Sequence, residues 1–438
     1  LGVLISWRAI DNRRRLFYVL FLLQQVAMLG IFVSLDLFLY YAFWELSLVP
    51  MALLIATFGR TENRRRAAMK FFLYAFIPSA ILLVGMLWLY ARTGTFQLPD
   101  LAQLAVNHGI SNNSAALWLA SLGFLVAFAV KVPIFPLHGW LSDAVSEAPT
   151  AAVMVLAGKL GLYSILRFSF GIFPGLSHRI APLMLALGAI GIVYGALLAM
   201  VQKDLKKLAA YGTLGHVSVV ILGIFAFTVS GIDGGIYQTL NEGIGGSALF
   251  MLLGLLYERY RTYDMREYGG LAARLPWIVT MFVLTALSVV GLPMLNGFVG
   301  EFLVFSGAMQ SAISHHILWT VLATSSVILT ASYMLWMIQR IFYGDLSRRA
   351  ESVAPIDLTT REHLALWPLV ALFLFMGIAS PVWLRAIDTA GAQIAATVNR
   401  SQAVTVDFDA SSHHSAPPQT SETAINMTTA SSATKGAR

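Results

Sequence analysis

Long apolar runs separated by short polar connections dominate the chain. A helix needs about 20 apolar residues to cross a bilayer, and the sequence offers eleven such stretches. They cover residues 16–35, 37–58, 68–91, 116–137, 147–170, 181–201, 207–228, 236–256, 276–311, 316–342 and 364–388. Stretches such as ILLVGMLWLYA lack the alternation of a transmembrane β-strand. The pattern predicts an all-α integral membrane protein with about eleven transmembrane helices.

Two of these spans contain helix breakers. Pro133 and Pro136 interrupt the fourth span directly after Lys131, and the GLPMLNG segment at 291–297 interrupts the ninth span directly before Glu301. Proline removes a helical hydrogen bond, and freed backbone groups are tolerated at membrane depth only where protein or water satisfies them. Interruptions at corresponding places in two halves indicate a transporter built from inverted repeats.

The spacing of ionisable residues supports this interpretation. Glu45 and Lys131 are 86 residues apart, and His216 and Glu301 are 85 apart. Five spans separate the halves, and an odd number inverts the second half relative to the first. We expect two inverted five-helix repeats, each with a broken helix, over residues 16–171 and 172–343.

The ends of the chain differ from its middle. Residues 1–15 include LGVLIS, which reads like the end of a helix whose beginning is missing. Residues 344–397 are expected to form a loop and the last transmembrane helix. From 398 to 438 the chain is rich in Ser, Thr, Ala and Asn, which cannot bury a core, so we expect a disordered polar tail.

The charges place the spans across the membrane. Hydrophobic residues make up 58% of the chain and charged residues 12%, with a formal net charge of +7. The basic residues gather in alternate connections, so the positive-inside rule puts the N-terminus in the cytoplasm and the tail on the outer side. They are Arg8, Arg13, Arg14, Arg15, Arg60, Arg64, Arg65, Arg66, Lys70, Lys203, Lys206, Lys207, Arg259, Arg261, Arg266, Arg274, Arg340, Arg348, Arg349 and Arg361.

The sequence lacks the residues and motifs that several kinds of cofactor site require. The chain has no cysteine, which excludes disulfides, thiolate chemistry and cysteine-ligated iron–sulfur clusters on this chain. It also lacks a Gly-rich phosphate loop after a strand. The positive charge belongs to membrane topology and is not evidence for nucleic-acid binding. We therefore expect no cofactor or metal on this chain, and a lipid bilayer around it.

Ionisable residues inside the spans are the candidates for function. A charge at the bilayer centre costs at least about 2.5–3.5 kcal/mol, so such residues usually face a partner or a water-filled path. Histidine joins them because its ordinary pKa lies near neutrality. The candidates are Glu45, Lys131, Lys159, His216, Glu242 and Glu301.

Each candidate also has a structural interpretation. His216 could be a hydrogen-bonded core residue as well as a proton carrier. Glu242 could brace backbone among its neighbouring glycines, which is the interpretation we favour from sequence alone. Glu45, Lys131 and Glu301 could form ion pairs that hold helices together, but this would not explain the broken helices.

Six motifs in order resemble one family. They are FWELSLVPM, KVPIFPLHGWLSDAVSEAPT, LAGKLGLYSILRF, QKDLKKLAAYGTLGH, DMREYGG and GLPMLNGFVGEFLV. Over residues 16–390 the chain is similar to the subunit M (subunit 4) family of bacterial NADH-quinone oxidoreductase, respiratory complex I. Members usually have fourteen spans, so the first three would be missing here. The resemblance implies a bacterial inner-membrane location and neighbouring membrane subunits as partners. It also implies that FMN, iron–sulfur clusters and quinone are bound in partner subunits.

The resemblance also implies roles for single residues. The essential glutamate of the family falls on Glu45, its channel lysine on Lys131, its connecting lysine on Lys159 and its terminal acid on Glu301. A second axis histidine of some relatives falls on Glu242, which departs from the pattern.

The expected mechanism is electrostatic. A low-dielectric site weakens the hold of a lysine on its proton, and a nearby carboxylate restores it. We expect Lys131 to load from the cytoplasm, charge to pass through Lys159 and His216, and Glu301 to deliver the proton outward, driven by redox chemistry elsewhere. The alternatives are a subunit of an Mrp-type sodium/proton antiporter, of a membrane hydrogenase or of an inorganic-carbon uptake complex, and a purely structural scaffold.

Overall fold

The first half of the chain is a set of helices joined by short connections. The computed structural model describes residues 2, 10, 12–106, 115–156, 159–353 and 355–412, with side chains as far as residue 400. Its helices are α2 (Arg14–Val33), α3 (Leu37–Phe58), α4 (Arg64–Thr93), α5 (Leu98–Val106), α6 (Ala115–Lys131), α7 (Leu141–Glu147), α8 (Thr150–Leu156), α9 (Lys159–Ser164), the π-helical turn η1 (Ile165–Ser169) and α10 (Phe170–Ile172).

The second half of the chain is also a set of helices joined by short connections. It contains α11 (Pro174–Met200), α12 (Leu205–Ile224), α13 (Val229–Tyr260), the 3₁₀ turns η2 (Met265–Glu267) and η3 (Leu271–Ala273), α14 (Pro276–Val290), α15 (Asn296–Met309), α16 (His316–Thr324), α17 (Ser326–Phe342), α18 (Arg348–Ser352), α19 (Thr360–Ile378) and α20 (Ser380–Ser412).

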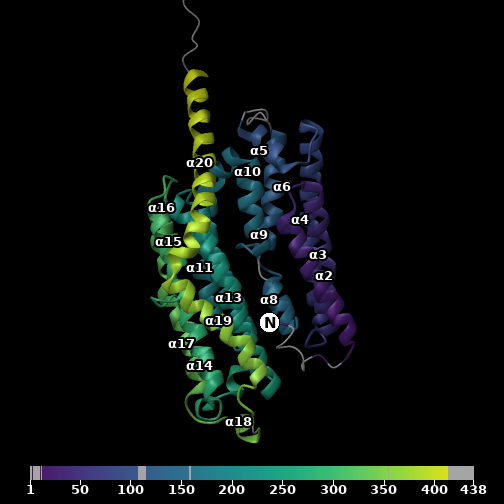
Figure 1. Ribbon diagram of the computed structural model, residues 1–438, viewed down its shortest axis with the longest axis vertical. Coiled ribbons are helices and arrows are strands. Elements are labelled where there is room, and N and C mark those ends of the chain that lie inside the picture. The colour runs from purple at the N-terminus through teal and green to yellow at the C-terminus, as the bar shows by residue number, and fades with distance from the viewer. Residues whose placement is uncertain are drawn as a thin grey trace, which may run out of the picture.

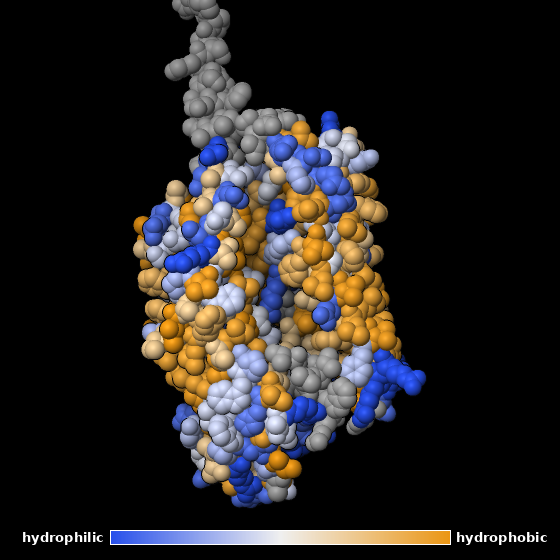
Figure 2. All heavy atoms as spheres, viewed as in Figure 1, coloured by the Kyte–Doolittle hydropathy of each residue, from blue (hydrophilic) through white to orange (hydrophobic). Residues whose placement is uncertain are grey.

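The bundle has two polar ends and an apolar middle. Within the described ranges, nine helices or runs of helices are long and apolar enough to cross a membrane, and α6 and α14 are shorter apolar helices. Orange residues form a broad belt around the middle in Figure 2, and blue residues gather at both ends. We call the end with α18 the basic end and the end reached by α20 the tail end (Figure 1). The predicted all-α membrane fold with broken helices is confirmed.

Both predicted helix breaks are present, and the first opens directly after Lys131, as expected. The fourth span was expected to continue to residue 137, whereas α6 ends at Lys131 and α7 starts at Leu141. Pro133 has no N–H for a helix to use and disfavours helical geometry in the residue before it. The second break lies between α14 and α15, where Gly291 caps α14 in the left-handed region at φ 81°, a conformation that glycine adopts without steric cost.

The last span departs from the sequence prediction. Instead of one helix over 364–388, α19 ends at Ile378 and α20 begins at Ser380. Residues 398–412, expected to belong to the disordered tail, continue α20 as a helix. The helix docks on the bundle there, because Val398 is fully buried and Asn399 Nδ2 donates a hydrogen bond to the Phe227 carbonyl at 3.1 Å. Residues 413–438 of the predicted tail and most of residues 1–15 lie outside the described residues.

Candidate functional site: a buried polar axis

Lys131 stands at the last position of α6, where the first break opens. Its ammonium lies 5.2 Å from the ring centroid of Trp44 and 5.9 Å from that of Phe71. Within the described structure, Lys131 and Glu45 do not form an ion pair within 4.0 Å, although Glu45 follows Trp44 in α3 and acts on Lys131 electrostatically. The carboxylate of Glu45 instead accepts a hydrogen bond from the Ser79 hydroxyl on α4. Aromatic faces attract a cation, so Lys131 is held by rings with a carboxylate nearby.

The first break is closed by local hydrogen bonds. Ile134 donates its backbone N–H to the Ala129 carbonyl at 2.9 Å, and the Trp140 indole donates to the Val130 carbonyl at 2.9 Å. Gly161 of α9 packs against this region, since a Cβ there would lie 2.8 Å from the Phe128 carbonyl oxygen and 3.0 Å from the Val132 nitrogen. The close contact brings the start of α9, and thus Lys159, next to the end of α6.

Lys159 connects the first half to the second. Its stem lies over Gly243 of α13, where a Cβ would be 3.6 Å from Lys159 Cε. Its ammonium interacts electrostatically with the Glu242 carboxylate on the same helix. Lys159 therefore reaches from the start of α9 in the first half to the centre of the second half.

A histidine between two carboxylates forms the centre of the second half. His216 Nδ1 on α12 lies 3.8 Å from Glu242 Oε1 on α13 and 3.6 Å from Glu301 Oε1 on α15. The three residues are 5%, 8% and 7% exposed. His216 Nε2 is buried without a hydrogen-bond partner among the described residues. Two acids thus lie close to the same nitrogen of one imidazole.

Glu301 lies beside the second break, and His216 and Glu242 line two small cavities. A Cβ on Gly291, which caps α14 at the break, would be 3.1 Å from Glu301 Oε2. Each cavity has a volume of about 10 Å³, one between His216, Glu242 and Tyr333, the other between His216, Glu242 and Asn241. A space of this size holds about one water molecule.

An amide pair fixes the second break beside Glu242. Asn296 Nδ2 donates to Asn241 Oδ1 at 3.0 Å, and Asn241 Nδ2 donates to the Asn296 carbonyl at 2.8 Å. Ser288 donates to Asn296 Oδ1 at 2.6 Å. Sequence reasoning missed these residues, although amides inside apolar spans are themselves a signal that polar partners are needed.

Sequence reasoning also misplaced Lys206. It was grouped with the basic loop residues, but it is 3% exposed. Its ammonium donates to the Ala148 carbonyl at 2.5 Å and lies 5.2 Å from the ring centroid of Tyr263. Ala148 lies in the short connection between α7 and α8. The residue therefore clamps the end of the first broken helix to the second half.

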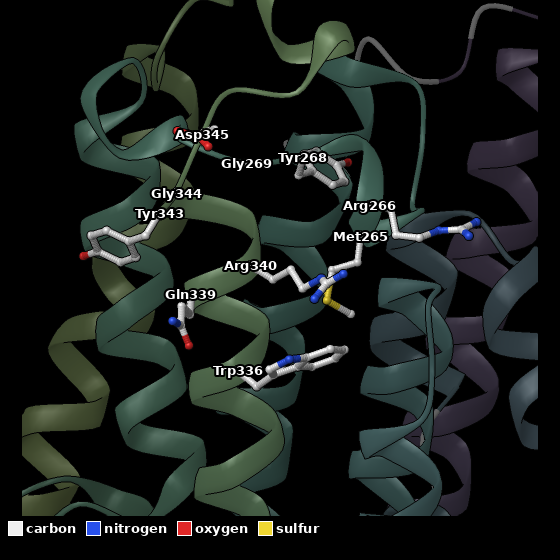
Figure 3. A pocket seen from close by; sticks show the side chains of 10 residues that line it. All are labelled: Met265, Arg266, Tyr268, Gly269, Trp336, Gln339, Arg340, Tyr343, Gly344 and Asp345. Carbon is white, nitrogen blue, oxygen red and sulfur yellow. The ribbon is translucent and has the colours of Figure 1, made fainter.

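A cavity larger than the two beside His216 lies away from this axis. It has a volume of about 450 Å³ at the basic end, between the η2 turn and the end of α17 (Figure 3). Its Arg266 forms an ion pair with Asp264 at 2.6 Å, and this ion pair lowers the pKa of the Asp264 carboxyl. Arg340 lies 5.5 Å from the Trp336 ring centroid. None of the six candidate residues lines this cavity. Within the described ranges, no group of three or more His, Asp or Glu side chains could hold a metal ion.

The arrangement of breaks and buried charges agrees with a known family. The profile described as "NADH:quinone oxidoreductase/Mrp antiporter, TM" matches residues 34–330. The chain belongs to this family. It is 40% identical over 390 residues to NADH-quinone oxidoreductase subunit M of Rhodobacter capsulatus, covering 86% of this chain and 74% of the relative. With subunit M of Escherichia coli K12 it shares 36% identity over 390 residues, covering 86% and 75%.

Solved structures of this family share the fold. A chain of respiratory complex I from Thermus thermophilus with bound NADH is 33% identical, with a TM-score of 0.81, and the match covers 91% of this chain and 82% of that one. A chain of the Mrp complex from Dietzia sp. DQ12-45-1b has a TM-score of 0.77 at 24% identity, covering 87% and 78%, a likeness of fold alone. The expected membership of the subunit M family is confirmed.

Proposed function

We propose that this chain is the proton-translocating membrane subunit of a complex I-type NADH-quinone oxidoreductase. The observation that carries the proposal is the continuous series of buried ionisable groups, Lys159, Glu242, His216 and Glu301, which crosses from one half of the bundle to the other. Buried charges of this kind mark ion pathways in membrane proteins. The relatives that share the fold and up to 40% identity are NADH-quinone oxidoreductase subunits.

Protons enter the axis through the first half. Lys131 takes a proton from the basic end, and its aromatic surroundings stabilise the charged form without a fixed salt bridge. Loss of that proton through the break changes the charge beside Lys159, and Lys159 in turn acts on Glu242. Like charges disfavour each other's ionised forms and opposite charges favour them, so a proton lost from Lys131 would help Lys159 keep its own, and a charged Lys159 favours an ionised Glu242.

Protons leave through the second half. His216 lies within 4 Å of both acids, so its proton can be shared with either, and Glu301 beside the second break passes a proton toward the tail end. Here Glu242 has a role that sequence alone did not favour, because it links Lys159 to His216 and does not merely brace backbone. Proton exchange of this kind needs groups within hydrogen-bonding reach or one water apart.

The energy comes from partner subunits. Electron transfer from NADH to quinone, with its FMN and iron–sulfur clusters, belongs to those partners, and this chain has no cysteine to ligate a cluster. The basic end faces the cytoplasm of a bacterial inner membrane and the tail end faces the outside, as the positive-inside rule requires. Neighbouring antiporter-like membrane subunits are the partners of the lipid-facing helices.

The test measures electron transfer and proton transport together. Inside-out vesicles with assembled complex carry His216→Gln or Glu301→Gln, and a matched control carries Glu351→Gln, an exposed acid of α18. NADH oxidation and an internal pH dye are followed in sodium-free buffer with a sodium ionophore. We expect the axis variants to lower the proton signal per NADH several-fold and the control to keep it. Normal ratios in all variants would overturn the proposal, and a signal that requires sodium would favour the antiporter alternative.

A further inference from the structure

Asp233 is a buried acid that the axis does not use. Sequence analysis left it in the connection between residues 228 and 236, but it lies inside α13, which starts at Val229. Its side chain is 7% exposed, and its Oδ1 has no hydrogen-bond donor among the described residues. Burying a carboxyl without a hydrogen-bond donor destabilises the fold. We therefore expect Asp233 to have a function that offsets this cost.

The group that faces Asp233 is a second carboxyl. Asp388 lies on α20 one turn before Gly391, where a Cβ would meet Asp233 Oδ1, and it is the charged group that acts on Asp233. Asp388 is exposed, as is Arg385 one turn earlier on the same helix. Within the described part of the chain, Arg385 does not form an ion pair within 4.0 Å with either acid. Two carboxyls in such contact repel each other unless one proton is held between them. The two carboxyls can therefore bind one proton between them. The carboxyl of Asp233 is buried and that of Asp388 is exposed.

The contact depends on a glycine of α20. A Cβ on Gly391 would lie 1.8 Å from Asp233 Oδ1, so any side chain there would push the carboxyl out of its position. Another face of α13 is packed tightly against α15. A Cβ on Gly234 would lie 2.6 Å from the Val304 nitrogen of α15, and one on Gly307 would lie 2.2 Å from the Gly231 nitrogen. Asp233 lies on the face of α13 that packs against α20.

A ladder of polar side chains connects the pair with the axis. Asp233, Tyr237 and Asn241 are spaced four residues apart on α13, which places them on one face with Cβ atoms about 5–6 Å from one another. Tyr237 donates its hydroxyl to the Met376 carbonyl at 2.6 Å, near the α19/α20 break. Asn241 belongs to the amide pair beside Glu242. The ladder thus runs from the centre of the axis toward the tail end.

We propose that Asp233 and Asp388 form the proton-release site of this chain at the tail end. The inference rests on the proposed function, which it extends past Glu301. A proton that leaves the Glu301 and Glu242 region is taken up by the carboxyl pair, where it lies between the two groups. It then dissociates from Asp388 to water on the tail side, and the pair returns to accept the next proton. Each transfer breaks the bond between the proton and its donor and forms one to its acceptor, and nothing is oxidised or reduced.

The test removes each carboxyl while keeping its size. Asp233→Asn and Asp388→Asn are assembled into the complex, and the ratio of protons transported to NADH oxidised is measured in inside-out vesicles. We expect each variant to lower the ratio several-fold at unchanged complex content. Asp388→Glu should keep the ratio, because the position is exposed and the carboxyl remains. Asp100→Asn, which removes an exposed acid of α5 at the same end, is the control and should also keep it.

The other outcomes are distinguishable. If Asp233→Asn and Asp388→Asn transport protons at the normal ratio, the pair only ties α20 to α13 and the inference is wrong. If Asp233→Asn prevents assembly, the test rests on the exposed Asp388→Asn, measured by the same ratio of protons transported to NADH oxidised. Glu301→Gln is measured in parallel: a normal ratio there would overturn the proposed function itself, whereas a low ratio with normal aspartate variants would overturn only the release site.

Discussion

At the scale of single residues, the first half of the chain holds Lys131 differently from what ion-pair reasoning suggests. Lys131 lies over Trp44 and Phe71, while Glu45 is hydrogen-bonded to Ser79. A cation over a ring gains about 0.5–2 kcal/mol, which is less than a buried salt bridge costs to break. The lysine can therefore give up its proton without leaving a carboxylate stranded.

Lys131→Met tests this arrangement. Methionine fills nearly the same volume but carries no proton, so we expect assembled complex with normal NADH oxidation and a several-fold lower proton signal. Glu45→Gln should have nearly the same effect, and Glu45→Asp a milder one, because it keeps the charge and moves it by about one methylene. Dye quenching in inside-out vesicles measures the result. Normal pumping by Lys131→Met in assembled complex would make the lysine merely structural.

Glu242 gives a second prediction at this scale. Because it links Lys159 to His216, Glu242→Gln should lower the proton signal several-fold while the complex still assembles. Glu242→Ala should do the same and also reduce complex content, since it empties a buried polar site. The structural interpretation predicts otherwise: full proton transport in Glu242→Gln, with a loss of assembly in Glu242→Ala.

At the scale of elements, the broken helices decide where charges can lie. Lys131 ends α6 directly before the first break, whereas Glu301 follows the second break in α15 and approaches Gly291 from the far side. The halves are therefore similar in topology but not in the placement of their charges. The last span is also divided, between α19 and α20, and the sequence did not predict this because Ser380 and Pro381 lie within an apolar run.

The contact of α9 with α6 supports a third prediction. Gly161→Val would push side-chain atoms into the Phe128 carbonyl and Val132, and overpacking of this kind costs about 1–3 kcal/mol. We expect α9 to shift, Lys159 to lose its position beside Glu242, and the proton signal per NADH to fall. Gly171→Val is the matched control, because a Cβ at Gly171 meets no atom within 4 Å. Equal ratios in the two variants would show that the contact does not position Lys159.

The sequence predicted a large part of the fold and the identity of the candidate residues. Apolar run length located the helices, and prolines and glycines located two breaks, since both effects are local. The pairing of His216 with both Glu242 and Glu301 could not be predicted, because it depends on how α12, α13 and α15 pack. The burial of Lys206 was missed for the same reason: its helix starts beside a loop, and only packing against Ala148 and Tyr263 removes it from water.

At the scale of the whole molecule, charge is distributed unevenly between the two ends. The basic connections at 59–66, 203–207, 259–274 and 340–361 all lie at one end, and α5 and the end of α20 lie at the other (Figure 1). The positive-inside rule turns this asymmetry into an orientation.

Single cysteines test the orientation. Arg348→Cys places an exposed thiol at the basic end and Ser314→Cys places one at the tail end, and the native chain contributes no thiol of its own. An impermeant thiol reagent added to intact cells or right-side-out vesicles should label Ser314→Cys alone, and the same reagent on inside-out vesicles should label Arg348→Cys alone. The label is read on this subunit after separation by gel. Labelling of both variants from one side would contradict the eleven-span arrangement.

The α19/α20 break lies directly on the second break of the axis. A Cβ on Gly377 would be 2.1 Å from the Met294 carbonyl oxygen and 2.6 Å from Leu295 Cα, so the two breaks touch backbone to backbone. Backbone in such contact has no side chain to absorb a movement. A change in the angle between α14 and α15 would therefore press on the end of α19, three residues before α20 begins, so the second break and the α19/α20 junction are mechanically coupled.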